Sequence, residues 1–196
     1  MYKRQVYINE KGEIAKEPVT DVANYIKLGS VLPDANMAWR NDFRWRNFNF
    51  GFMVSARLGG VVFSRTQSML DYYGVSEATA AARDAGGVMI NGNDLVDANK
   101  WYTAIGGGNS VPQYYTYSAT NVRLQEASIG YTIPKKTLGD ICEITLSLVG
   151  RNLWMIYNKA PFDPEITAST GTYYQGLDYF MQPSSRTIGF SVRLQF

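Results

Sequence analysis

Long stretches of alternating apolar and polar residues constrain the fold of this chain more than any other feature. In the clearest run, which ends the sequence, every second side chain is apolar: Ile188, Phe190, Val192, Leu194 and Phe196. Successive side chains of a β-strand point to opposite faces of a sheet, so this period predicts a strand with one apolar face. A helix would repeat its apolar positions every three to four residues.

Four further long runs and one short run have the same period and predict strands. They cover residues 6–8, 37–45, 48–56, 122–131 and 141–152. Arg46 and Asn47 separate two of the runs and predict a tight turn. Asn41 is the polar exception in an otherwise apolar row. A strict period of two also places Glu126 on the same face as Val122 and Leu124, which weakens the alternation there.

The length of these runs separates a membrane barrel from a soluble sheet. The longest runs have 10 to 12 residues, whereas strands of globular proteins usually have about 5 to 6. A tilted strand needs roughly 9 to 11 residues to cross a bilayer. Any half-buried antiparallel strand alternates, so length rather than alternation favours the barrel.

The connections between the runs alternate between short and long. The links at 46–47 and 132–140 are short, while 58–121 and 153–185 contain 64 and 33 residues. In an antiparallel meander, this order places both long links on one side, as in outer-membrane barrels with short periplasmic turns and long extracellular loops. Such long connections are uncommon in soluble domains. Within the longer link, 75–85 predicts one short helix.

The predicted fold class is therefore all-β: an antiparallel meander of long transmembrane strands with long extracellular loops. Five long strands cannot close a membrane barrel, since the smallest have about eight. Open edges would leave backbone groups unpaired in lipid. We therefore expect the chain to be the C-terminal segment of a larger barrel.

Composition excludes several functional classes. The sequence has no histidine and one cysteine, Cys142, which excludes Ser-His-Asp and Cys-His catalysis, His-ligated metals and an internal disulfide. A net charge of +2 argues against a nucleic-acid partner that needs a strongly basic surface. Asp163 and Glu165 are close in sequence, as a glycosidase requires, but a proline separates them, and we expect no enzymatic activity and no cofactor.

Four ordered stretches resemble the C-terminal part of SusC/RagA-type TonB-dependent outer-membrane transporters of Bacteroidetes. They contain a Gly-x-x-x-Pro-Asp segment, a strand ending in Tyr-x-x-Pro, a Gly-x-Asn-Leu strand followed by Asp-Pro-Glu, and the terminal strand. In this sequence they lie at 26–64, 121–135, 144–166 and 183–196. Each motif alone is modestly specific, but their order and spacing agree with the family as well.

The resemblance implies the organisation and function of the chain. Residues 6–196 would be the C-terminal segment of a barrel of about 22 strands, while 1–5 resemble a translated sequencing adapter. The stretches that carry the resemblance include neither the plug domain nor the TonB box, which couple transport to energy in the family. The implied function is import of glycans or oligopeptides across the outer membrane. The implied partners are a SusD-like lipoprotein, the TonB complex, the barrel-assembly machinery and outer-membrane lipid.

Two alternatives remain open at this point. One is a different outer-membrane barrel, such as a porin, which the four ordered motifs disfavour. The other is a soluble β-rich binding module, which the strand length and the one-sided long loops disfavour. A soluble module would melt cooperatively without detergent. An isolated membrane strand such as 48–54 would instead expose four large apolar side chains to water, at about 1.5–3 kcal/mol each.

Four sets of residues are candidate functional residues. Aromatic residues near strand ends are candidates for a membrane-interface girdle: Trp39, Trp45, Tyr131 and Trp154. The apolar row of the last strand, Ile188 to Phe196, resembles the signal that the barrel-assembly machinery reads by edge pairing. Loop aromatics that contact cargo or the lid, or that pack the loops, are Trp101, Tyr102, Tyr173, Tyr174 and Tyr179. A polar row facing the lumen, where it would meet the plug or solvent, is Arg40, Asp42, Arg44 and Arg46.

Overall fold

The chain divides into two compact units. The computed structural model describes residues 6–9, 14–16, 23, 27–90, 94–166, 171 and 174–196. The sheet unit comprises 32–60, 118–164 and 182–196, and the helical unit comprises the remainder. Residues 1–5 and Tyr173, which the sequence analysis singles out, lie outside the described residues.

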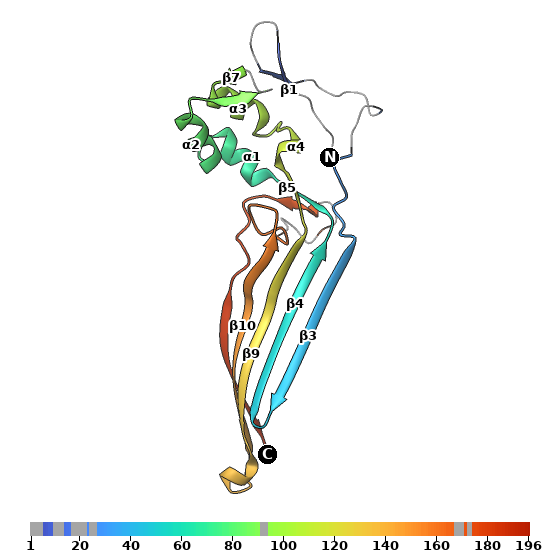
Figure 1. Ribbon diagram of the computed structural model, residues 1–196, viewed down its shortest axis with the longest axis vertical. Coiled ribbons are helices and arrows are strands. Elements are labelled where there is room, and N and C mark those ends of the chain that lie inside the picture. Colours follow the sequence, from blue (N-terminus) through green and yellow to red (C-terminus); the bar gives the residue numbers. More distant parts are fainter. Residues whose placement is uncertain are drawn as a thin grey trace. The chain divides into compact units, whose positions relative to one another are not determined.

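The sheet unit is an antiparallel meander of five strands (Figure 1). In chain order, the strands are β3 (Ala35–Trp45), β4 (Phe48–Leu58), β9 (Asn121–Ile133), β10 (Glu143–Asn158) and β12 (Thr187–Gln195). Each strand pairs with the one that precedes it in this list, so β3 and β12 form the two edges. The five long strands predicted from alternation are therefore confirmed, and β10 extends six residues beyond the predicted end at 152.

Both short links lie at the same end of the sheet as the C-terminal residue (Figure 1). Arg46, in the turn between β3 and β4, has a φ of 53°. Between β9 and β10 the chain forms the 3₁₀ helix η2 (Lys135–Leu138), and Gly139 follows with a φ of 67°. Glycine adopts this left-handed conformation without the steric penalty that other residues meet. The predicted turn and the predicted short link at 132–140 thus lie on one side.

An irregularity in β9 corrects the predicted phase of that strand. The register of β4 on β9 shifts between Met53, which pairs with Glu126, and Val54, which pairs with Leu124. The extra residue, Gln125, reverses the alternation, as a β-bulge does. Glu126 therefore does not share a face with Val122 and Leu124. It lies on the polar face, and the apolar row continues through the bulge.

The helical unit consists of described chain that precedes β3, links β4 to β9, and links β10 to β12. Its strands are β1 (Val6–Ile8), β2 (Ile14–Lys16), β5 (Val61–Ser64), β6 (Val88–Ile90), β7 (Asp94–Val96), β8 (Thr116–Ser118) and β11 (Leu177–Asp178). Its helices are α1 (Arg65–Tyr72), α2 (Glu77–Asp84), α3 (Ala98–Ile105) and α4 (Pro112–Tyr115). None of the described helices is long and apolar enough to cross a membrane.

Helices α1, α2 and α3 begin at residues whose side chains accept a hydrogen bond from a backbone N–H group of the first turn. Ser64 accepts a hydrogen bond from the Gln67 amide at the start of α1, and Ser76 accepts one from Thr79 at the start of α2. Such caps stabilise helix ends by about 1 kcal/mol. The helix predicted at 75–85 is confirmed by α2. The sequence analysis missed α1, α3 and α4, although Ala98, Trp101 and Ile105 of α3 are buried at helical spacing.

The core of the helical unit is small and aromatic. The buried side chains that cluster there are Phe63, Trp101, Ile105, Val111 and Tyr115. They come from β5, α3, the residue before α4, and α4 itself. Partly buried residues of β6, β7 and β11 pack around them. This core gives the longer connection a compact fold of its own.

Candidate functional sites

The apolar face of the sheet is continuous across all five strands. Phe50 of β4 pairs with Phe43 of β3 and Ile129 of β9, and Ile129 in turn pairs with Leu148 of β10. Leu148 then pairs with Phe190 of β12. More than two fifths of each of these side chains is exposed. A soluble monomer seldom exposes so wide an apolar surface, so we expect lipid or another protein to contact this face.

The four girdle candidates lie in two rows of this face. Trp45 pairs with Phe48, and Phe48 with Tyr131. The ring centroids of Phe48 and Tyr131 are 4.9 Å apart in an edge-to-face arrangement.

The second row lies further along the strands. Trp39 pairs with Val54, Val54 with Leu124, and Leu124 with Trp154. Trp39 packs edge-to-face on Phe52, with ring centroids 5.5 Å apart. The two rows therefore occupy two levels of one face.

The opposite face of the sheet is polar and holds the Arg40–Asp42 pair. The Arg40 Nε donates to Asp42 Oδ2 at 2.8 Å, and both side chains are exposed. Arg44 pairs in register with Asn49 on the same face. Arg46 instead lies in the turn, where its guanidinium is 5.6 Å from the centroid of the Trp45 ring. The predicted polar row therefore comprises three residues of β3 and one turn residue.

The last strand carries the predicted assembly row at a sheet edge. Its apolar residues pair with apolar residues of β10: Phe190 with Leu148, Val192 with Leu146, and Leu194 with Ile144. Phe196 follows the strand and is 81% exposed. Within the described residues, the other side of β12 has no paired strand.

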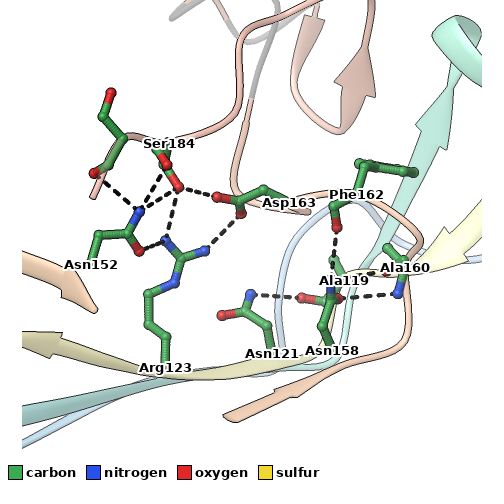
Figure 2. A network of polar contacts seen from close by, with 10 residues as sticks. Ala119, Asn121, Arg123, Asn152, Asn158, Ala160, Phe162, Asp163 and Ser184 are labelled. Atoms are coloured by element: carbon green, nitrogen blue, oxygen red, sulfur yellow. Dashed lines mark hydrogen bonds and ion pairs between the residues drawn. The ribbon is translucent and has the colours of Figure 1, made fainter. Parts of the chain in front are cut away.

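A polar cluster that is buried at Arg123 and exposed at Ser184 joins three of the four sequence motifs (Figure 2). We call Arg123, Asn152, Asp163 and Ser184 the polar cluster. The Arg123 guanidinium on β9 donates to Asp163 Oδ1 at 2.7 Å, and these side chains are 3% and 9% exposed. Arg123 also donates to Asn152 Oδ1 at 3.0 Å. A buried carboxylate held in this way is a structural partner of arginine, which explains the Asp-Pro-Glu aspartate without catalysis.

Asn152 connects this pair to the segment before β12. It lies in a bulge of β10, where the register on β9 shifts between Arg151 and Trp154, and its φ is 53°. The Asn152 amide donates to Ser184 Oγ at 2.8 Å and to the Ser184 carbonyl at 3.1 Å. The Ser184 hydroxyl donates to Asp163. Side chains of β9 and β10 and the loop thus bind the start of the last strand.

Asn158 holds the loop that carries Asp163. Its amide nitrogen donates to the carbonyls of Ala160 and Phe162 at 2.9 and 2.7 Å, and its oxygen accepts from the Ala160 amide at 3.1 Å. Figure 2 shows this loop curling back toward Arg123. The end of β10 therefore determines where Asp163 is presented.

The loop aromatics differ in exposure. Trp101 is 8% exposed and lies in the core of the helical unit, with its ring edge-to-face on Tyr114. Tyr102 is half-buried, and its hydroxyl donates to the Ala78 carbonyl at 3.3 Å. Tyr174 and Tyr179 are each 47% exposed. Only the latter two present much of their rings for contact with another molecule.

Three tyrosines of the helical unit surround a buried aspartate. Burial raises the pKa of the Tyr115 hydroxyl, and the Asp71 carboxylate raises this pKa further. The same two causes, in the same order, raise the pKa values of Tyr102 and Tyr117. Asp71 itself accepts from the Gln67 side-chain amide at 2.8 Å. A neutral phenol beside a buried carboxylate stays protonated, because ionisation would add a second negative charge.

Sequence reasoning missed Arg123, Asn152 and Ser184 as members of one site. Each lies in a quoted motif, but the motifs are separated by up to 61 residues between Arg123 and Ser184. The sequence did offer one signal. Arg123 is a charged residue between the apolar Val122 and Leu124 of a predicted strand, and Asp163 is an acidic residue in a loop.

Comparison with known proteins gives one curated relative and several solved structures. No model of a known protein family matches the sequence. TonB-dependent receptor P3 of Formosa agariphila is 25% identical in an alignment of 177 positions that covers 86% of this chain and 17% of that receptor. The chain therefore spans about a sixth of the length of this relative.

The solved structures agree in fold. Two are the RagAB peptide importer in its "closed-closed" and "open-open" states, at 12% and 13% identity, and a third is the RagAB peptide transporter, at 14%. Each has a TM-score of 0.68 and covers 100% of this chain and 22% of the matched chain. The predicted resemblance to SusC/RagA-type TonB-dependent receptors is thus confirmed, and the chain has the fold of a segment of their barrel.

Proposed function

We propose that this chain is a wall segment, with its long loops, of a TonB-dependent outer-membrane importer of the SusC/RagA type. The observation that carries the proposal is the continuous apolar face of five paired strands, more than 10 residues long in four of them, opposite a polar face. In a barrel wall, the apolar face contacts lipid and the polar face lines the lumen.

Site-directed labelling tests this orientation. Asn49 and Phe50 are neighbours on β4 with side chains on opposite faces. In the full-length protein, with Cys142→Ser as background, a membrane-impermeant maleimide should label Asn49→Cys wherever the lumen admits it. Phe50→Cys should react with a lipid-soluble reagent instead. Equal labelling of both positions by the aqueous reagent would contradict the proposal and favour a soluble module.

For the whole protein, we propose import of glycans or oligopeptides with a SusD-like lipoprotein as partner. The names of the solved neighbours, a peptide importer and a peptide transporter, support the oligopeptide class. The name of the curated relative, a TonB-dependent receptor, supports an energy supply through TonB. Growth of a deletion strain on peptide mixtures and on glycans as sole nutrient distinguishes the two cargo classes. A porin would let small solutes pass without TonB.

The exposed loop aromatics are the proposed contacts with cargo or with the lipoprotein. Tyr179 is the stronger candidate, because its ring is exposed and has the Arg65 guanidinium 5.8 Å from its centroid. Flat rings beside a cation can stack on a sugar or peptide plane. Tyr174→Ala and Tyr179→Ala should weaken cargo binding, whereas Tyr73→Ala, at another exposed ring of the helical unit, should not. Unaltered binding in both variants would remove these residues from the site.

A further inference from the structure

We infer that the polar cluster sets the register in which the last strand, β12, pairs with β10. The inference goes beyond the proposed function, since it concerns the register in which β12 pairs with β10. It holds whether lipid or another protein surface contacts the apolar face. It assigns Arg123, Asn152 and Asp163 as positioning residues for the C-terminal strand.

The side chains of β12 do not by themselves exclude a two-residue shift. On the apolar face, Phe190 pairs with Leu148, and a shift would place Ile188 or Val192 there instead. Both are apolar, although smaller than phenylalanine, so the apolar character of the face would be kept. On the polar face, small residues dominate the first half of the strand. A one-residue shift would expose the wrong face, but a two-residue shift preserves the alternation.

The polar cluster favours one register of β12 on β10, and it lies next to the first paired residue of β12. Thr187 of β12 pairs with Arg151, the residue before Asn152. Asn152 in turn binds the side chain of Ser184 and the carbonyls of Ser184 and Ser185. Three residues span at most about 11 Å when extended, and a two-residue shift moves a strand by about 7 Å. With Ser184 bound, such a shift would either use up most of the reach of the three linking residues or leave them slack, so the link favours the observed partner of Thr187.

The energy of the cluster favours the observed register. Ser184 donates to Asp163, and Asp163 accepts from Arg123 in a pair that is almost fully buried. Moving Ser184 away would leave the nearly buried Asp163 carboxylate with one donor fewer. Buried polar groups that lose partners are strongly unfavourable. The shifted registers thus lose hydrogen bonds that only the observed one makes (Figure 2).

Cysteine cross-linking between β10 and β12 reads the register directly. Ser147 pairs with Ser191, at a separation suited to a disulfide. The full-length protein would carry Cys142→Ser and Ser147→Cys, combined with Ser191→Cys for the observed register, or with Gly189→Cys or Arg193→Cys for the shifted ones. With the cluster intact, oxidation should yield the disulfide of the observed register almost alone.

Breaking the cluster should redistribute these disulfides. In Asn152→Ala, which leaves the ion pair in place, the observed pair should fall by roughly half or more and a shifted pair should rise. Asp163→Asn should act in the same direction. The matched control is Arg151→Ala, which removes the ion pair between Arg151 of β10 and Glu126 of β9. This variant should leave the yields of the three disulfides unchanged.

Two outcomes would overturn the inference. One is an unchanged yield of the observed disulfide in both Asn152→Ala and Asp163→Asn. The other is an equal redistribution in Arg151→Ala, which would mean that any loss of polar contacts between β9 and β10 has this effect. If Asp163→Asn yields no folded protein, Asn152→Ala alone decides. Loss of import with unchanged cross-links would affect the proposed function only.

Discussion

At the scale of single residues, Asn41 is the most informative departure from pattern. It pairs with Phe52 in the middle of the apolar face, and Trp39 and Phe43 flank it along the strand. Within the described part of the chain, its side-chain nitrogen is buried and has no hydrogen-bond partner. A buried amide without a partner destabilises a fold by about 1–3 kcal/mol.

Replacing Asn41 by leucine should therefore stabilise the protein. Asn41→Leu should raise the free energy of unfolding by about 1–3 kcal/mol, measured by urea unfolding in detergent micelles or vesicles. The control is Asn49→Leu, because Asn49 donates to Thr132 Oγ1 at 2.9 Å on the polar face and its loss should destabilise. If Asn41→Leu also destabilises, a group outside the described residues binds the amide in the full-length protein, and the missing partner is not the cause.

Single residues also mark where prediction from sequence ends. The alternation at 48–56 predicts the strand that the structure shows at Phe48–Leu58, and it predicts which side chains lie on the apolar face. It does so because a sheet with one apolar face places every second residue of a strand on that face. The bulge at Gln125 could not be predicted, since it depends on how β9 meets two neighbours at once. The Arg123–Asp163 pair could not be predicted either, because the fold alone brings these residues together across 40 positions.

At the scale of elements, the last strand combines an apolar face with an open edge. Its residues from Ile188 to Leu194 alternate on the same face as those of β10. Phe196 extends the apolar row beyond the last paired residue and is exposed. An amphipathic edge strand can add to another sheet through main-chain hydrogen bonds, with its side chains giving specificity.

Removing the terminal aromatic should impair assembly. Deletion of Phe196 in the full-length protein should lower the amount recovered in the outer membrane, because the assembly machinery loses the last apolar anchor. Surface labelling and membrane fractionation measure the effect. Phe196→Tyr, which keeps the ring, should assemble normally, while Phe196→Ser should resemble the deletion. Unchanged surface levels in the deletion would argue against an assembly signal at this residue.

At the scale of the whole molecule, the two units are stabilised by different interactions. The sheet unit exposes its apolar face and depends on a cover. The helical unit buries its own core around Phe63, Trp101 and Tyr115. This core was not predicted, because the sequence analysis expected one helix in this region, at 75–85, and missed α3, which contributes Trp101 and Ile105. The two units should therefore respond differently to changes in solution conditions.

Alkaline pH should destabilise the helical unit first. Tyr102, Tyr115 and Tyr117 have raised pKa values in the fold. Below about pH 10 tyrosines are protonated in the folded and unfolded chain alike; above it, the unfolded chain releases protons that the fold retains, so stability falls as pH rises.

The helical circular-dichroism signal should therefore decrease above about pH 10. Tyr115→Phe should move this loss to higher pH, while the control Tyr73→Phe, at an exposed ring, should leave it in place. If the helical signal depends on pH equally in Tyr115→Phe and in the unchanged protein, ionisation of the buried Tyr115 is not what destabilises the helical unit.

The long excursion between β4 and β9 begins and ends at one spot. The Gly60 carbonyl accepts a hydrogen bond from the Ala119 amide at 3.0 Å, and the Gly59 amide donates to Thr120 Oγ1 at 3.0 Å. Such a junction closes the excursion at its base, so the length of the intervening chain can change while β4 and β9 keep their register. Because β5 at the start of the excursion also pairs with β11, any change of this loop is linked to the second long connection, and the two should vary together.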